Sequence, residues 1–307
     1  MNKKESFMQK TIVVWMGAMI CCALWGSAFP FIKIGYRLFD VSSDATGTQI
    51  LFAGLRFTLA GILTVILGSI ISKKILLPKK ESVSKIFKLC LLQTVGQYIF
   101  FYIGLANTSG VKASIIEGLN VFIAIFAAGL IFHQEKITSK KMIGCLIGFA
   151  GVILVNLDGT SMDTGFQISG EGAIMISTVA TAFASALMKS YSKKENPVVL
   201  SGYQFAVGGV IMVMIGVLMD GNLTRVSTRG ICVLLYLAAV SAVAYSLWGI
   251  LLKYNPVSKV AVFGFMNPVF GVILSALLLG EANTLRFTCF VSLLLVSLGI
   301  FIVNKYN

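Results

Sequence analysis

The sequence predicts an all-α membrane protein with ten transmembrane helices, arranged as two inverted five-helix repeats around a central cavity. Three observations indicate this class. Of the 307 residues, 57% are hydrophobic and only 12% are charged, whereas a soluble protein has roughly 25% charged residues. Apolar runs of about membrane-spanning length recur along the chain, as helices that cross a bilayer require. The two halves of the chain also resemble each other.

Ten apolar segments follow one another with short connections, which indicates one integral membrane domain without a second, soluble domain. The first repeat, residues 1–157, holds segments at 11–33, 48–71, 84–105, 111–132 and 139–157. The second repeat, residues 158–307, holds segments at 170–190, 197–219, 230–253, 257–280 and 284–304.

A shift of 147 or 148 residues superposes the two halves. With a shift of 147, Asn120 falls on Asn267, and with 148 the run GVILVN at 151–156 matches GIFIVN at 299–304. Each half has five helices, an odd number, so the second half must enter the membrane from the opposite side. In transporters with inverted repeats, the binding site lies between the repeats near the middle of the membrane.

The basic residues predict the orientation and the partners. Of the 25 lysines and arginines, 18 fall on the side of both termini and six on the other side. Because positive charge is enriched on the cytoplasmic side, both termini are expected in the cytoplasm, with the chain in a bacterial cytoplasmic membrane. The same distribution explains the net charge of +13 without nucleic acid as a partner. The expected partners are a small-molecule substrate and membrane lipids.

Two further patterns concern assembly and cofactors. The glycines of Gly144-x-x-x-Gly148 predict close helix packing, either within the monomer or at the face of a homodimer. The six cysteines lie in apolar segments and form neither a CxxC motif nor a Cys/His cluster. We therefore expect no metal and no cofactor.

Three sets of short motifs carry a family resemblance over nearly the whole chain. They are Trp25-Gly26-Ser27, the run from Gly104-Leu105 through Glu135 to Gly144, Gly148 and Gly151, and Asn267-Pro268-Val269-Phe270 with Gly280-Glu281. On these motifs the chain resembles the drug/metabolite transporter superfamily, EamA branch. The first half departs from the pattern, because Val121 rather than proline follows Asn120, and His133-Gln134 precedes Glu135 where glycine is usual. The resemblance implies ten helices, a central cavity and the export of small metabolites.

Arg56 and Glu117 are the strongest candidates for a polar site inside the membrane. They lie on the second and fourth segments, each roughly 8–12 Å below the outer surface. One interpretation is a buried ion pair that locks two helices, because intramembrane charges usually pair. Another is a water-accessible site in which Arg56 binds a carboxylate and Glu117 binds an ammonium or a proton. A third is an arginine that snorkels to the interface.

Neutral polar and aromatic side chains complete the predicted site. Amides inside a membrane need a partner, which is either a neighbouring helix or the substrate. Aromatic rings either line the pathway or form a belt at the membrane interface. Pro30 and Pro268 are predicted hinges, because proline breaks the helical hydrogen bonding. The predicted substrate-binding residues are Trp25, Arg56, Gln97, Tyr98, Glu117, Asn120, Gln204, Tyr245, Trp248 and Asn267, with Glu117 also the candidate for proton coupling.

These features predict a secondary active transporter that exports a small polar or zwitterionic metabolite, such as an amino acid, by alternating access. The direction comes from the resemblance alone. The sequence contains no Walker-type loop, so ATP-driven transport by this chain alone is not expected, and neither is enzymatic activity. Two alternatives stay open: a membrane-embedded enzyme that acts on lipid-linked substrates, and a non-transporting receptor or assembly partner.

Overall fold

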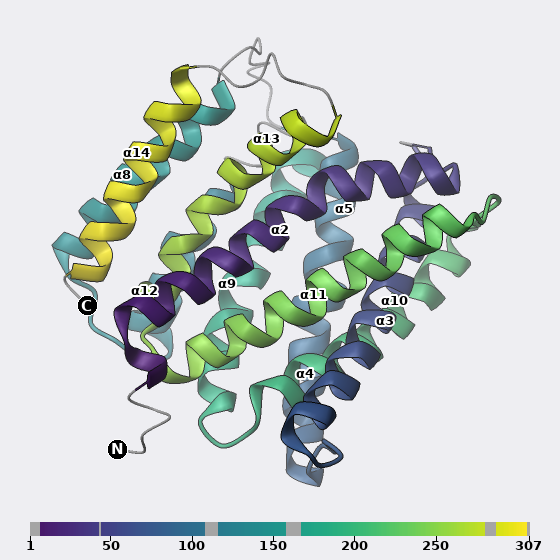
Figure 1. Cartoon of the computed structure of the whole chain (residues 1–307), viewed down its shortest axis with the longest axis horizontal. Coiled ribbons are helices and arrows are strands. Elements are labelled where there is room, and N and C mark those ends of the chain that lie inside the picture. The colour runs from purple at the N-terminus through teal and green to yellow at the C-terminus, as the bar shows by residue number, and fades with distance from the viewer. Residues whose placement is uncertain (1–6, 43, 108–115, 158–166, 280–286, 306–307) are drawn as a thin grey trace.

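The computed structural model describes residues 7–42, 44–107, 116–157, 167–279 and 287–305, and all regular structure in these ranges is helical (Figure 1). The helices of the first half are α2 (Thr11–Phe39), α3 (Thr46–Ser72), α4 (Val83–Leu89), α5 (Gln97–Asn107), α7 (Asn120–Phe126) and α8 (Ser139–Leu157). Those of the second half are α9 (Ala173–Ser192), α10 (Pro197–Leu218), α11 (Thr228–Tyr254), α12 (Val257–Ala261), α13 (Met266–Leu279) and α14 (Phe287–Lys305). Short helical segments of other types join some of them: the π-helical segments η2 (Cys90–Gly96), η3 (Ala127–Ile131) and η4 (Ile168–Gly172), and the 3₁₀ turn η5 (Val262–Phe265).

The lengths and hydropathy of the described helices confirm a multi-pass, all-helical membrane protein. Six helices are long and apolar enough to span a membrane, and shorter apolar helices lie at 116–131, 257–271 and 290–305. The total of ten spans stays a prediction. The six long helices are Thr11–Phe39, Thr46–Ser72, Lys80–Gly104, Ile168–Ser192, Pro197–Leu218 and Thr228–Tyr254.

The first helix is longer than predicted. α2 continues through the buried Pro30 to Phe39 and ends where Asp40 adopts a left-handed conformation with φ of 57°. Proline lacks the N–H that would bond to the residue four positions earlier, here Gly26. An added Cβ on Gly26 would lie 3.0 Å from the backbone nitrogen of Gly271 in α13, so the weakened turn lies at a close contact between helices.

The closest helix contact joins α3 to α10 and depends on glycines spaced by seven residues. An added Cβ on Gly54 would lie 2.5 Å from the backbone nitrogen of Val213, and one on Gly68 would lie 2.7 Å from Val198. Because early residues of α3 meet late residues of α10 and the reverse, the two helices run antiparallel. The glycines concerned are Gly47, Gly54, Gly61 and Gly68 on α3 and Gly202, Gly209 and Gly216 on α10.

The helices α8 and α14 form a second antiparallel pair, which lies apart from the first in Figure 1. An added Cβ on Gly144 would lie 2.8 Å from Val303, and one on Gly151 would lie 2.9 Å from the carbonyl oxygen of Ser292. The glycine face around Gly144 is therefore used inside the chain. A homodimer stays a prediction that this face does not support.

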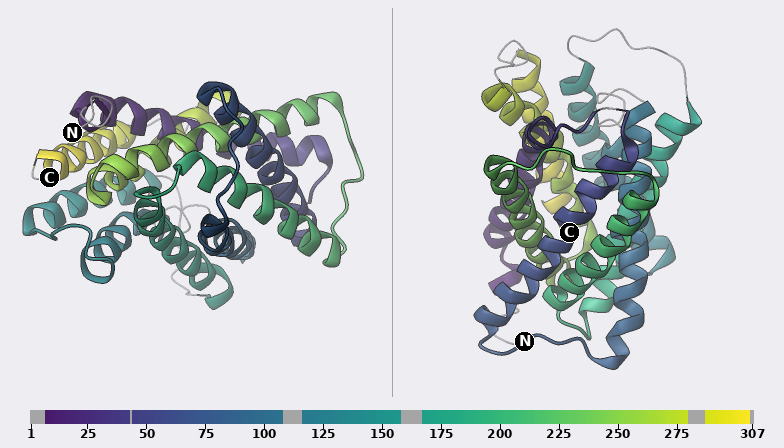
Figure 2. Two further views of the ribbon diagram at one scale, coloured as in Figure 1. Left: turned by 90° about the horizontal axis from the view of Figure 1, so that it is seen from below. Right: turned by 90° about the vertical axis from the view of Figure 1, so that its right-hand side faces the viewer.

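The remaining helices surround the space between these pairs. α2 packs against α11 and α13, while α9 packs against α5, α7 and α11. Helices of the first and second halves thus interleave instead of forming two separate bundles, as the further views show (Figure 2). Every wall of the interior is consequently built from both halves of the chain.

Candidate transport cavity

A cavity of about 290 Å³ lies among the interleaved helices and receives side chains from both halves. This volume is near the lower end of the range of about 300–1,000 Å³ found for small-molecule pockets. Nine of the ten predicted substrate-binding residues lie in the cavity wall, and their role in binding stays a prediction. They are Trp25, Arg56, Gln97, Tyr98, Glu117, Asn120, Tyr245, Trp248 and Asn267.

Gln204 lies behind the wall. Its side chain is fully buried, and its Nε2 donates a hydrogen bond to Gln93 Oε1 at 2.6 Å. Gln93, which lines the cavity, therefore separates Gln204 from any ligand. Gln204 occupies the place of Arg56 in the repeat, but its face of α10 packs against η2.

The side chain of Arg56 extends from α3 to α11, where it forms two hydrogen bonds. Its side chain is 3% exposed, its Nε donates to the carbonyl oxygen of Leu237 at 3.3 Å, and its Nη2 donates to Ser241 Oγ at 2.9 Å. The guanidinium carbon lies 5.1 Å from the centre of the Phe57 ring. This burial contradicts the interpretation of Arg56 as a snorkelling arginine. A guanidinium has five N–H donors, so donors remain for a ligand.

Glu117 lies in the helical turn at 116–118 that precedes α7, and its half-buried side chain faces the cavity. Within the described residues, neither a hydrogen bond nor an ion pair joins its carboxylate to Arg56 or to another side chain. The buried ion pair considered from the sequence is thus absent from this conformation. The guanidinium of Arg56 and the carboxylate of Glu117 therefore lie in the same cavity wall without pairing, so each can contact a ligand.

The aromatic residues form one connected cluster in the wall. The ring of Trp25 lies edge-on to Tyr245 and to Trp248, each at 5.0 Å between centroids. The hydroxyl groups of Tyr98 and Tyr245, which the repeat relates by 147 residues, are hydrogen-bonded at 2.7 Å. The cluster therefore joins the two halves at the cavity rather than forming a belt at the membrane interface.

Asn120 and Asn267 lie at helix breaks inside the apolar segments predicted at 111–132 and 257–280. Asn120 is the first residue of α7, and Asn267 lies in the first turn of α13, directly after the 3₁₀ turn η5. Pro268 follows in the same turn, where backbone N–H groups have no acceptor within the helix, so the missing N–H of proline costs no hydrogen bond there. The Oδ1 atom of each asparagine is buried without a hydrogen-bond partner among the described residues.

The wall also contains polar residues that were not predicted as ligands. Thr178, Thr181 and Ser185 recur every three or four residues along α9, so they lie on one face. This spacing is visible in the sequence and would have identified the stripe. Lys33 ends the first predicted segment and was counted among the six basic residues of the outer side. The unpredicted polar residues of the wall are Lys33, Tyr36, Gln93, Tyr102, Thr178, Thr181 and Ser185.

No metal or cofactor site is evident in the part of the chain that the structure describes, where no three His, Cys, Asp or Glu side chains come together. The polar groups of the cavity are amides, hydroxyls, one carboxylate and two cationic side chains. Such groups bind and orient a polar ligand through hydrogen bonds and charge.

Comparison with known proteins decides the family. The model of the EamA-like transporter family matches residues 12–157 and 168–305. The chain belongs to the EamA-like transporter family. This match confirms the resemblance found in the short motifs. Relatives of this EamA-like chain are named as a transporter or as an efflux pump.

The relatives and a solved structure cover nearly the whole EamA-like chain. An uncharacterized transporter of Archaeoglobus fulgidus is 29% identical over 95% of this chain and 98% of its own length. A probable amino-acid metabolite efflux pump of Salmonella typhimurium is 25% identical over 92% of this chain and 90% of its own length. A crystal structure with 16% identity covers 95% of this chain and 96% of its own chain with a TM-score of 0.76, which shows that the two share a fold.

Proposed function

We propose that this EamA-like chain is a secondary active transporter that exports a small polar or zwitterionic metabolite, such as an amino acid, by alternating access. The observation that carries the proposal is the cavity between the halves, in which Arg56 and Glu117 lie without pairing to each other. A guanidinium suits a carboxylate through its bidentate fork, and a carboxylate suits an ammonium. A zwitterion satisfies both groups at once.

The geometry of the helix pairs supports an inverted repeat of ten spans. The shift of 148 residues relates Gly54 to Gly202 and Gly151 to Gly299, so α3 corresponds to α10 and α8 to α14. Both corresponding pairs run antiparallel. Corresponding helices of two repeats inserted in the same direction would run parallel. Inverted repeats provide the two related conformations that alternating access requires.

The composition of the wall and one relative support the substrate class. The aromatic cluster offers an apolar surface next to the charged groups, which fits a metabolite with a polar head and a less polar remainder. The Salmonella typhimurium relative is named a probable amino-acid metabolite efflux pump. We place the chain in a bacterial cytoplasmic membrane with both termini in the cytoplasm, on the distribution of basic residues.

The test is a substrate screen in proteoliposomes, with and without a pH gradient. We expect exchange of at least one labelled zwitterionic metabolite, with loss of at least about 100-fold in rate for Arg56→Gln, since a buried charge-assisted contact is worth several kcal/mol. Glu195 is not part of the cavity wall, so Glu195→Gln is the control and should keep the parental rate. An Arg56→Gln variant that folds and transports at the parental rate would overturn the proposed site. Stimulation by the pH gradient that disappears in Glu117→Gln would assign proton coupling to Glu117.

A further inference from the structure

The cavity is closed toward one end of the bundle. On α2 its lining begins at Trp25 and continues toward Phe29 and Tyr36, whereas Cys21 and Cys22, one turn before Trp25, are fully buried. The cysteines belong to a continuous apolar core that includes parts of α2, α7, α11, α12 and η5. By the distribution of basic residues this closed end faces the cytoplasm. The structure thus has a cavity that is sealed on the side assigned to the cytoplasm.

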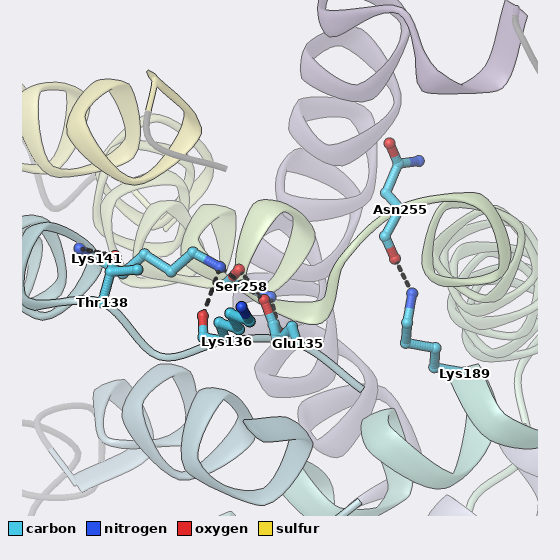
Figure 3. A network of polar contacts seen from close by, with 7 residues as sticks. All are labelled: Glu135, Lys136, Thr138, Lys141, Lys189, Asn255 and Ser258. Carbon is cyan, nitrogen blue, oxygen red and sulfur yellow. Dashed lines mark hydrogen bonds and ion pairs between the residues drawn. The ribbon is translucent and has the colours of Figure 1, made fainter. Parts of the chain in front are cut away.

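At the sealed end, α11 turns into α12 over the two residues that follow Tyr254. Lys189 of α9 reaches this corner, where its Nζ donates to the carbonyl oxygens of Leu252, at 3.2 Å, and Asn255. Figure 3 shows the contact with Asn255. A cation at the carboxyl end of a helix is favoured by the helix dipole. The first arm of the corner, α11, is therefore held by a charged group from another helix.

The second arm, α12, is held from the first half of the chain. Glu135 follows η3, and its Oε1 accepts a hydrogen bond from the backbone nitrogen of Ser258 at 2.9 Å. Its Oε2 accepts from Ser258 Oγ and from Lys141 Nζ, the latter at 3.0 Å (Figure 3). The side chains of Lys141 and Glu135 are 6% and 5% exposed, so these bonds are shielded from water.

The two buried cysteines of α2 contact α11 and the turn η5 that follows α12. Cys21 Sγ donates to the carbonyl oxygen of Ala244 in α11 at 3.3 Å, and Cys22 Sγ donates to that of Phe263 in η5 at 3.1 Å. A path from the cavity to the cytoplasm between α2 and the corner has to separate these contacts. α12 is only five residues long and is followed by the 3₁₀ turn η5, so this arm has a break at each end about which it can pivot.

We propose that Glu135, together with Lys189, is a positioning residue that holds the inner gate of the transport pathway closed, and that the gate is the α11–α12 corner. The proposal rests on the proposed function, because a gate has meaning only in alternating access. Opening to the cytoplasm exposes the Glu135 carboxylate and the Ser258 N–H to water, which replaces their hydrogen bonds. Such an exchange costs little net free energy, which suits a contact that breaks in every cycle.

Cys22 serves as the reporter in a variant whose other five cysteines are replaced by alanine. A membrane-impermeant maleimide is added to the cytoplasmic face of inside-out vesicles, and the rate of alkylation of Cys22 is measured. We expect Glu135→Ala to raise this rate about tenfold or more, equivalent to about 1.4 kcal/mol in the closed-to-open equilibrium. Glu135→Gln keeps an acceptor for Ser258 and should give a smaller increase.

The matched control is Glu195→Gln. Glu195 pairs with Lys85 at 3.0 Å, which also joins the two halves at this end but not at the corner, so its loss should leave the alkylation rate unchanged. Parental rates in folded Glu135→Ala protein overturn the gate. Where that variant does not fold, Ser258→Ala and Glu135→Gln decide by the same measurement. If transport occurs but Cys22 never reacts from the inner side in any variant, the gate lies elsewhere; if no substrate is transported at all, the proposed function fails first.

Discussion

A double-mutant cycle on Arg56 and Glu117 separates a structural ion pair from a shared ligand site. The Arg56 guanidinium bonds to Leu237 and Ser241, so Arg56→Ala removes those contacts. Hydrogen bonds to charged groups contribute about 1.5–3 kcal/mol in soluble proteins, and polar contacts between membrane helices average about 0.6 kcal/mol. We therefore expect Arg56→Ala to lower the free energy of unfolding by about 1–3 kcal/mol.

Glu117→Ala should cost little stability, because its carboxylate has no protein partner within the described residues. The two changes should then add, with an interaction energy below about 0.5 kcal/mol, as for residues that share no contact. The assay is denaturant unfolding of the four purified proteins in detergent micelles. An Arg56/Ser241 cycle is the positive control and should show coupling of about 1 kcal/mol. A double mutant of Arg56 and Glu117 that is more stable than either single mutant would refute this reasoning, since buried ion pairs behave in that way.

Two further predictions concern stability. Gly54→Ala places a Cβ 2.5 Å from a backbone nitrogen of α10, and overpacking of this kind should lower the free energy of unfolding by about 1–3 kcal/mol. Thermal unfolding measures this loss against the control Gly264→Ala, whose added Cβ meets only a side-chain atom at 3.6 Å. The Ser82 hydroxyl, followed by the Lys85 ammonium, lowers the pKa of Glu195 from its ordinary value of 4.5. The stability that this carboxylate contributes is complete above pH 4.5 and is lost as the pH falls through the lower folded value. As the pH falls from about 7 to below the folded pKa of Glu195, the melting temperature of the parent should therefore fall more than that of Glu195→Gln, and equal decreases would contradict the assignment.

The location of the cavity was predictable because the membrane makes buried polar groups costly. Arg56, Glu117 and the amides interrupt long apolar runs, and such groups must face protein or water. The repeat also relates Tyr98 to Tyr245, and the hydroxyl groups of these two side chains are hydrogen-bonded in the cavity wall. The seven-residue spacing of glycines on α3 and α10 is equally visible in the sequence, although only the structure shows that the two stripes face each other.

Other features depend on tertiary contacts that the pattern does not contain. The repeat relates Gln204 to Arg56 but cannot tell that η2 covers Gln204 and leaves Arg56 in the wall. The single turn residue Leu119 before Asn120 and the 3₁₀ turn η5 before Asn267 both lie within continuous apolar runs, in which hydrophobic periodicity does not reveal them. Glu135 belongs to a motif shared with the family, yet its partner Ser258 is 123 residues away, and no local spacing connects them.

A transport cycle needs parts that stay together and parts that separate, and the contacts of this chain divide in that way. Along α3 and α10, glycines bring two backbones into direct contact over the whole helix length. Separating the two helices would lose the dispersion contacts along several turns. No polar groups would be exposed there whose hydrogen bonds with water could compensate for this loss. The α11–α12 corner is held by a few charged side chains whose bonds water can replace. If the glycine pairs are the fixed axis and the corner moves, Gly54→Ala should impair folding without changing the alkylation of Cys22 in the folded fraction, whereas Glu135→Ala should do the reverse. A Gly54→Ala protein that folds fully but shows faster alkylation would show that the division is wrong.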